Sequence, residues 1–153
     1  MSTVRIYPAS DDELEYAATM RAAMAREMGH DWDGAHPGWR VRFAGFWRDK
    51  QAFGASQVFF AESGGGALVG MVIASVSDEY RAVAFGQPRG YINGVYVQPD
   101  RRRQGIGREL MHAALGWLRE KGCVAARLRA SEDGRALYTT LGFKPGVEME
   151  LSL

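Results

Sequence analysis

The chain has 153 residues, of which 46% are hydrophobic and 24% are charged, as is usual for one soluble globular domain. Its formal net charge of +1 gives no overall basic surface, so we expect no nucleic-acid partner. The single cysteine, Cys123, excludes a disulfide framework and a four-cysteine zinc site. No apolar run approaches the about 20 residues of a membrane span, and the start lacks the apolar segment of a signal peptide. We therefore expect a cytoplasmic protein with no membrane partner.

The first third of the chain predicts one strand followed by two helices. Val4 to Tyr7 alternates apolar and polar side chains, as a short strand does. Apolar residues at near-helical spacing predict a helix from Asp11 to about Met28, preceded by a capping-box sequence. The stretch from His30 to Gly38 carries turn-forming residues and predicts a loop. Aromatic residues at helical spacing then predict a second helix from Trp39 to about Gly54.

The middle of the chain predicts most of a sheet. Two segments rich in Val, Ile and Phe, Gln57 to Glu62 and Ala67 to Val76, flank a glycine-rich turn and predict a hairpin. Two further strands are predicted at Tyr91 to Val97 and at Val124 to Ala130. Between them, apolar residues at helical spacing predict a helix from Gln104 to Lys121. Since a hairpin is antiparallel and a strand–helix–strand unit is parallel, the sheet should be mixed.

The C-terminal part predicts a short helix from Glu132 to Leu141, followed by one or two strands within Phe143 to Leu151. No Pro- or Ser-rich linker divides the chain and no internal repeat is present. We therefore expect an α/β fold in which residues 1–153 form a single domain.

The segment that carries the chemistry is the loop between the strand ending at Val97 and the helix that follows it. Gly105 and Gly107 have no side chains, so a ligand can approach the backbone closely there. The free N–H groups of a first helical turn and the positive end of the helix dipole suit a phosphate or pyrophosphate. Four arginines add charge-assisted donors; they are Arg101, Arg102, Arg103 and Arg108. The plainer reading is a solvated basic turn whose glycines serve its conformation.

Two common nucleotide-binding patterns do not fit this loop. The P-loop sequence G-x-x-x-x-G-K-[S/T] is absent. The dinucleotide-binding pattern requires a third glycine where Leu110 stands, and a repeat of strand–helix–strand units that the chain lacks.

At this point the sequence resembles a known family. Residues Arg102 to Gly107 fit the [Q/R]-x-x-G-x-[G/A] signature of the GNAT superfamily of acyl-CoA-dependent N-acetyltransferases. A second block, from Ser131 through Tyr138 to Phe143, is similar to the "LY…GF" ending of that family. The resemblance implies a single-domain GNAT fold: a mixed, mostly antiparallel central sheet, about four flanking helices and splayed central strands.

The resemblance also implies that acetyl-CoA is the acyl donor and that no metal is needed. Its pyrophosphate would lie on the backbone N–H groups from Arg103 to Arg108. Its pantetheine arm would pair with the backbone of Val95 and Val97 like an added strand, and an N–H near Val95 or Tyr96 would polarise the thioester carbonyl. The residues expected to bind the donor are Val95, Tyr96, Val97, Arg102, Arg103, Gln104, Gly105, Ile106, Gly107, Arg108, Ser131 and Tyr138.

For catalysis, the resemblance implies that Tyr138 gives a proton or hydrogen bond to the leaving thiolate. Without it, Tyr138 would be read as a core aromatic residue. Many relatives carry a glutamate on the strand before the signature, where this chain has Asn93 and no acid. Asn93 would then orient the amine or a water. Candidates for the general base, beside a water chain, are Glu27, His30, Asp31, Asp33, His36, Asp78 and Glu79.

Three positions depart from the family pattern. Arg103 stands where glycine is frequent, Ser131 where asparagine is frequent, and Gly134 where alanine is common. Backbone groups would do most of the binding, so the departures affect side-chain roles more than the site itself.

The expected function is acetyl transfer to a primary amine by direct attack on the thioester. The acceptor is left open between a small amine or amino acid, an antibiotic-like polyamine, and a peptide N-terminus or lysine. The alternatives are a non-catalytic acyl-CoA-binding module of the same fold and a transferase for a longer acyl chain. A homodimer is the commonest oligomeric default.

Two other features of the sequence have plainer interpretations. The histidines and aspartates between His30 and His36 match no metal-binding motif and suit a loop. Trp32, Trp39 and the aromatic residues after them either wall the acceptor site or, more commonly, pack in the core.

Overall fold

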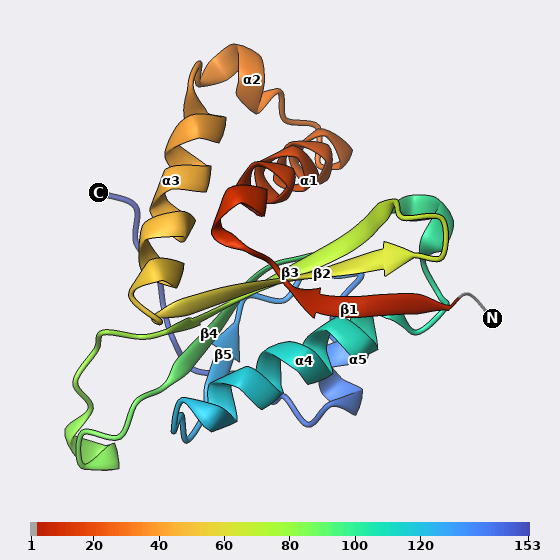
Figure 1. The fold of residues 1–153 in the computed structure, drawn as a ribbon. Coiled ribbons are helices and arrows are strands. Elements are labelled where there is room, and N and C mark those ends of the chain that lie inside the picture. Colours follow the sequence, from red (N-terminus) through yellow and green to blue (C-terminus); the bar gives the residue numbers. More distant parts are fainter. Residues whose placement is uncertain (1–2) are drawn as a thin grey trace.

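The computed structural model, which describes residues 3–153, is built around one five-stranded sheet (Figure 1). The strands follow one another in chain order across the sheet. They are β1 (Val4–Pro8), β2 (Ser56–Ser63), β3 (Leu68–Val76), β4 (Gly90–Val97) and β5 (Ala126–Leu128). The first three pairings are antiparallel and the β4–β5 pairing is parallel. This confirms the predicted mixed, mostly antiparallel sheet.

Helices cover both faces of this sheet (Figure 1). One face carries α1 (Leu14–Glu27), the single-turn α2 (Trp32–Ala35) and α3 (Trp39–Ala52). The other face carries α4 (Ile106–Glu120) and α5 (Arg135–Thr140). Short 3-10 turns lie at Asp11–Glu13, Ala82–Ala84 and Pro99–Arg101. The four longer helices are those predicted, and α2 is an additional turn within the expected loop, where Asp31 accepts a hydrogen bond from the Gly34 N–H at 3.1 Å.

Each face of the sheet has its own apolar core. On the α4 side, the buried stripe of α4 packs against alternate residues of β2, β3 and β4. On the other side, Leu14 and Ala17 of α1 and Ala44 of α3 pack against the opposite side chains of the same strands. The central strands are therefore buried on both faces, which explains their continuous apolar sequences.

Two predictions at the C-terminal end need correction. β5 is only three residues long, shorter than the predicted Val124 to Ala130. The prediction of strands within Phe143 to Leu151 is wrong, because the described chain has no strand after β5. The apolar side chains of Val147 and Met149 are 96% and 97% exposed, since no layer packs on them. Glu148, between them, instead forms an ion pair with Arg127 of β5.

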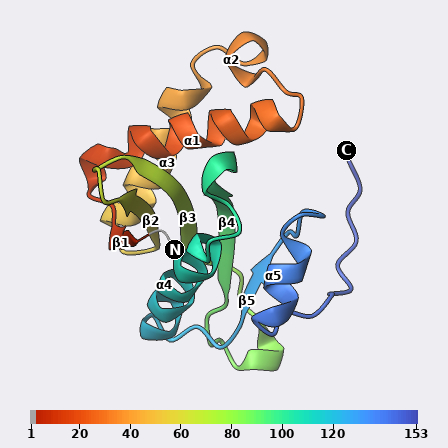
Figure 2. The same cartoon turned by 90° about the vertical axis from the view of Figure 1, so that its right-hand side faces the viewer.

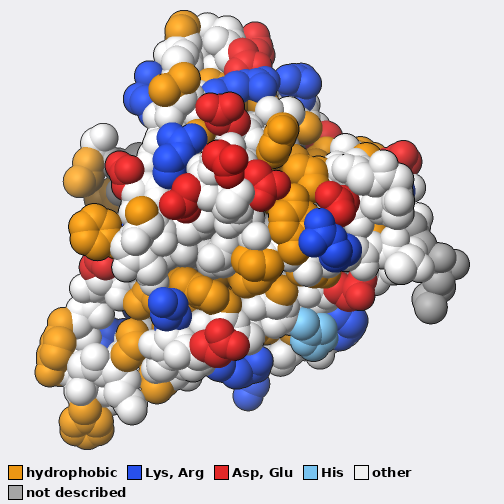
Figure 3. Space-filling model, in the orientation of Figure 1, with side chains coloured by type: hydrophobic (Ala, Val, Ile, Leu, Met, Phe, Trp, Pro, Cys, Tyr) orange, Lys and Arg blue, Asp and Glu red, His pale blue; other side chains and the backbone are white. Residues whose placement is uncertain are grey.

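The surface carries no single sign of charge. Figure 3 shows acidic and basic side chains interspersed over the helical layer, in keeping with the net charge of +1. Among residues 3–153, no helix has the length and apolarity that crossing a membrane requires.

Candidate active site

The central feature of the site is that β4 and β5 pair only at their beginnings. Their register runs from Gly90 opposite Ala126 to Ile92 opposite Leu128, and no later residue of β4 has a partner on β5. Figure 2 shows β5 leaning away from β4 toward α5. The splayed strands that the resemblance implied are therefore present, and the second half of β4 has one open edge.

A bulge lies in β4 where this open edge begins. Asn93 pairs with Ile73 and Tyr96 with Met71, so Gly94 and Val95 together lie opposite Val72. Gly94 has φ +58°, in the left-handed region that favours glycine. A bulge of this kind leaves local backbone groups unpaired and redirects them.

The bulge decides which backbone groups of β4 face the open edge. The Gln98 N–H donates to Val69 O of β3 at 2.9 Å. Since successive peptide groups of a strand point to opposite sides, Tyr96 also faces β3, whereas Val97 and Val95 face the space that β5 has left. Of the two N–H groups expected to polarise a thioester, that of Val95 therefore has the suitable orientation.

The loop between β4 and α4 leaves a run of backbone donors unengaged. From Arg103 to Arg108, no N–H donates to a backbone carbonyl of the described chain, and the first helical bond is from Glu109 N to Gly105 O at 3.1 Å. Arg103 and Gly105 both have left-handed backbone, with φ of +64° and +83°. Such alternation turns successive N–H groups toward one concave side, which together with the start of the 15-residue helix α4 suits an anion.

The four arginines around this loop differ in their partners. Arg102 Nε donates to Val97 O at 2.8 Å, and its Nη2 lies 2.8 Å from Glu27 Oε1. Arg108 Nη2 donates to Thr140 Oγ1 of α5 at 2.9 Å. The exposed side chain of Arg103 has no partner among residues 3–153, while Arg101 is engaged.

Tyr138 lies on α5, on the α4 side of the sheet. Its ring is buried and packs edge-on against Phe143, with centroids 6.0 Å apart. Burial raises the pKa of its phenol above the ordinary 10.0. No described group accepts a hydrogen bond from its Oη. A protonated phenol without a protein acceptor is suited to donate to a ligand.

The start of α5 is shaped around this tyrosine. Ser131 Oγ accepts from the Gly134 N–H at 3.1 Å and so holds the turn that leads into α5. A Cβ on Gly134 would lie only 2.8 Å from Tyr138 Cε2. Gly134 thus leaves room for the ring of Tyr138, and Ser131 fixes the turn before the helix that carries it.

Asn93 lies on the other face of the sheet from Tyr138. It pairs directly with Ile73, whose side chain belongs to the core beneath α1 and α3. Its side chain has no hydrogen-bond partner among residues 3–153. Asn93 and Tyr138 therefore flank the splay from opposite faces of the sheet.

Several candidate bases are held in structural contacts. Both carboxylate oxygens of Glu27 accept from Arg102. Hydrogen bonds from Arg40 and Trp39 lower the pKa of Asp33 to about 2, which makes it a weak base. As shown above, Asp31 caps α2.

Two further candidates lie far along the sheet. Glu79 pairs with Arg89, five residues before Gly94, which is about 16 Å along a strand. Asp78 is its neighbour in sequence. The structure thus brings neither to the bulge, and within residues 3–153 the side chains of His30 and His36 have no partner.

The aromatic residues of α2 and α3 form a packed series. Trp32 meets Trp39 edge-on at 5.1 Å, Trp39 meets Phe43 at 5.8 Å, and Phe43 meets Trp47 at 6.4 Å between ring centroids. Phe43 and Trp47 pack on the core beneath α1 and α3. The stripe is therefore chiefly packing, as the commoner interpretation expected.

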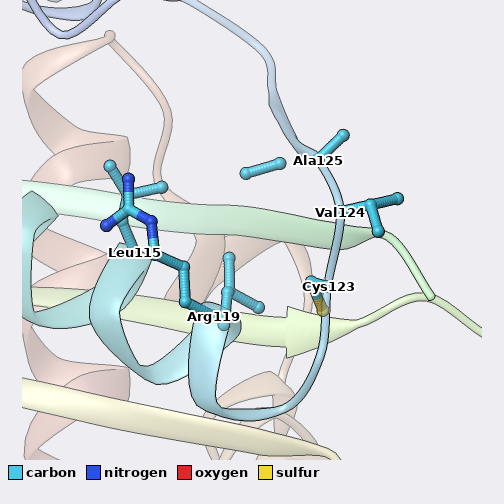
Figure 4. Close-up of a pocket in the computed structure, with 7 residues that line it drawn as sticks. Leu115, Arg119, Cys123, Val124 and Ala125 are labelled. Atoms are coloured by element: carbon cyan, nitrogen blue, oxygen red, sulfur yellow. The ribbon is translucent and has the colours of Figure 1, made fainter. Parts of the chain in front are cut away.

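One hollow of the molecule lies away from this site. Figure 4 shows Leu115 and Arg119 at the end of α4 and Cys123, Val124 and Ala125 on the chain entering β5, all of which line the hollow. The hollow measures about 130 Å³. It lies at the opposite end of α4 from the loop of unengaged N–H groups. Cys123 packs on the α4-side core, and burial raises the pKa of its thiol.

Two features of the candidate site were not predicted from the sequence. The bulge was missed because Tyr91 to Val97 reads as one continuous strand, although the Asn93–Gly94 pair inside it is a turn signal. The contact of Arg102 with Glu27 joins residues 75 apart in the chain, beyond the range of any local pattern.

Comparison with known proteins agrees with this geometry. The sequence profile described as "Acetyltransferase (GNAT) family" matches residues 22–143. A GCN5-related N-acetyltransferase from Ralstonia eutropha JMP134 is 30% identical, with 99% of each chain covered and a TM-score of 0.85. A predicted acetyltransferase from Clostridium acetobutylicum, solved with acetyl-CoA, has a TM-score of 0.86 at 18% identity and shows likeness of fold.

Curated relatives match over part of their length. An aminoglycoside N(6')-acetyltransferase type 1 from Stenotrophomonas maltophilia is 35% identical over 90 residues, 57% of this chain and 59% of the relative. The corresponding enzyme from Acinetobacter genomosp. 13 is 33% identical over 49% of this chain and 53% of its own. This chain thus spans a little over half the length of these relatives. Together, the profile match and the full-length likeness show that the chain belongs to the GNAT family of acetyltransferases.

Proposed function

We propose that the protein transfers the acetyl group of acetyl-CoA to a primary amine by direct attack on the thioester. The observation that carries this proposal is the junction of three features at one end of β4: an open strand edge, a bulge at Gly94, and a run of unengaged N–H groups from Arg103 to Arg108. Family membership supplies the reaction class, and this junction supplies a place for the donor.

The donor would be held mainly by backbone. The pyrophosphate fits the N–H groups from Arg103 to Arg108, where Gly105 and Gly107 keep the surface free of side chains. The pantetheine arm then occupies the open edge of β4 and pairs with Val95 and Val97. Gln104, Ile106 and Arg108 contribute to the pyrophosphate site through their backbone N–H groups. Ser131 supports the bound donor from the turn before α5.

The chemistry needs a stabilised oxyanion and a proton for the leaving group. When the amine nitrogen attacks the carbonyl carbon, the C–N bond forms and negative charge develops on the oxygen, which the Val95 N–H faces. The C–S bond then breaks and the thiolate takes a proton from Tyr138. Burial keeps the Tyr138 phenol protonated over the physiological range of pH.

The amine must first lose a proton, since its ordinary pKa is about 10. Because the structure holds the carboxylates of Glu27 and Asp33 in ion pairs, we assign this step to water. Asn93, which faces the α1 side without a protein partner, orients that water or the amine.

The experiment is release of free thiol from acetyl-CoA in the presence of an amine panel. The panel contains kanamycin, because curated relatives are aminoglycoside acetyltransferases, together with spermidine, lysine and a short peptide with a free N-terminus. Amine-dependent release with a stoichiometric acetylated product supports the proposal. Tight acetyl-CoA binding without turnover on any amine would instead support a non-catalytic binding module.

A further inference from the structure

A cluster of side chains ties the C-terminal end of α1 to the end of β4. Arg102 Nη2 lies 2.8 Å and 3.0 Å from the two carboxylate oxygens of Glu27, the last residue of α1. The Arg102 Nε donates to Val97 O, the last carbonyl of β4, at 2.8 Å. The guanidinium also lies 5.7 Å from the centre of the Tyr96 ring.

Tyr96 of β4 is the third residue of the cluster. Its side chain is buried in the core beneath α1, and burial together with the charge of Glu27 raises the pKa of its phenol. The ion pair with Arg102 holds the Glu27 carboxylate at the boundary between α1 and β4. The side chains of Arg102 and Glu27 are 41% and 35% exposed. A salt bridge this exposed adds little to stability, so its main effect is to fix the positions of the two side chains.

These contacts engage the Arg102 side chain with protein groups: Nη2 meets Glu27 of α1, and Nε meets Val97 O at the open edge of β4. The unengaged N–H groups lie on the following residues, 103–108. The next residue, Arg103, has the opposite character, with an exposed side chain and no partner among residues 3–153.

The position of the cluster relates it to the acceptor. Asn93 and Tyr96 pair with Ile73 and Met71, so both face the layer of α1 and α3. In the proposed reaction the donor arrives along the edge of β4 from the loop before α4. The amine then has to approach the bulge past α1, whose end Glu27 and Arg102 hold in place.

We propose that Glu27 and Arg102 are a positioning pair that fixes the end of α1 over β4 and so shapes the acceptor side of the site. In this assignment Glu27 is not the general base and the Arg102 side chain is not a phosphate ligand. The inference rests on the proposed function, because it refers to the approach of an amine.

The experiment compares Glu27→Gln, Arg102→Gln and the double variant with wild type, using the amine that the panel identifies. Acetyl-CoA affinity is measured separately by titration without amine. Arg5→Gln is the matched control, because Arg5 pairs with Glu62 across β1 and β2 at 3.0 Å, away from the cluster. Glu27→Asp tests rescue by the conservative change.

We expect each single variant to raise the amine KM about fivefold, the size of effect that a partly exposed ion pair supports. The acetyl-CoA Kd, kcat and the acidic limb of the pH–rate profile should stay close to wild type. The double variant should resemble the singles, since both remove the same contact. Glu27→Asp should recover part of the loss, and Arg5→Gln should leave the amine KM unchanged.

Three results would overturn the inference. A tenfold or greater weakening of acetyl-CoA binding in Arg102→Gln alone would make Arg102 a phosphate ligand. Loss of the acidic limb in Glu27→Gln would make Glu27 the base. A lower melting temperature with unchanged kinetic constants would leave the pair with a structural role only. Wild-type protein that turns over no amine would count against the proposed function itself.

Discussion

The two sides of the β4 splay are built on different principles. On the side of the loop before α4, backbone N–H groups from Arg103 to Arg108 are left without backbone partners. On the side of α1 to α3, two carboxylates are held in ion pairs, Glu27 with Arg102 and Asp33 with Arg40. A ligand can therefore meet open donors on the first side, while the second side offers a wall that contains these two ion pairs.

This difference explains why the donor side can tolerate more sequence change than the acceptor side. Backbone donors survive most substitutions, so Arg103 and Ser131 can depart from the family pattern without removing the anion site. A wall built from paired side chains changes whenever either member of a pair is substituted. This suits a surface that distinguishes one amine from another.

On the donor side, Tyr138 differs from the backbone donors because its side chain is assigned a chemical role. Tyr138→Phe should lower kcat about 100-fold, because the thiolate loses its proton donor, and should leave acetyl-CoA affinity nearly unchanged. Steady-state kinetics and a binding titration measure the two effects. Wild-type kcat should persist to a pH above 10.0, since burial raises the pKa of the phenol. Unchanged turnover in Tyr138→Phe would remove the assignment.

The backbone donors themselves are tested by two glycines at the ends of α4. Gly105 and Gly122 have φ of +83° and +82°, and a Cβ on either would meet no atom within 4 Å. Alanine at either position should therefore cause a similar destabilisation of about 1 kcal/mol. Only Gly105→Ala should weaken acetyl-CoA binding, by about 30-fold, because its Cβ enters the space of the pyrophosphate. Equal affinities in the two variants would contradict a backbone-built donor site.

A smaller effect is expected at Gly134, which tests whether the position of Tyr138 matters. Its Cβ in Gly134→Ala would meet Tyr138 Cε2 at 2.8 Å, so the ring must move. We expect kcat to fall about fivefold, and to fall no further when Tyr138→Phe is already present. Gly116→Ala is the control, because Gly116 lies in α4 with no atom within 4 Å of its built Cβ. A full additional loss in the double variant would mean that Gly134 acts independently of the hydroxyl.

The smallest effect concerns the paired wall of the acceptor side. Hydrogen bonds from Arg40 and Trp39 lower the pKa of Asp33 from 3.8 to about 2. The stabilisation from this contact is present above pH 3.8 and is lost as the pH falls through about 2. Asp33→Asn should therefore lower the melting temperature near neutral pH, and the difference from wild type should vanish near pH 2. A difference that persists in acid would show that the charge of Asp33 is not its cause.

Much of the fold could be predicted from local patterns. The stripe of α4 and the alternation of β2 and β3 have strong periodicity, and both elements were predicted within a few residues. The two glycines of the loop were found because spacing alone marks a strand–loop–helix turn. The alternation after Phe143 predicted a strand wrongly, because a strand needs a pairing edge and a covering layer that local sequence does not reveal.

The site was harder to predict where it depends on distant contacts. Two candidate bases are engaged in ion pairs, Glu27 with Arg102 and Asp33 with Arg40, and the first pair joins residues 75 apart. The orientation of Val95 depends on the bulge at Gly94, which changes which peptide groups face β3. Both features depend on tertiary structure, which composition and residue spacing do not reveal.

Amide hydrogen exchange with and without acetyl-CoA shows whether backbone N–H groups hold the donor. We expect slower exchange at residues 103–108 and at Val95 and Val97 when acetyl-CoA is saturating, with little change at the C-terminal end of α4. Unchanged exchange at these amides in protein that binds acetyl-CoA would contradict backbone binding of the donor.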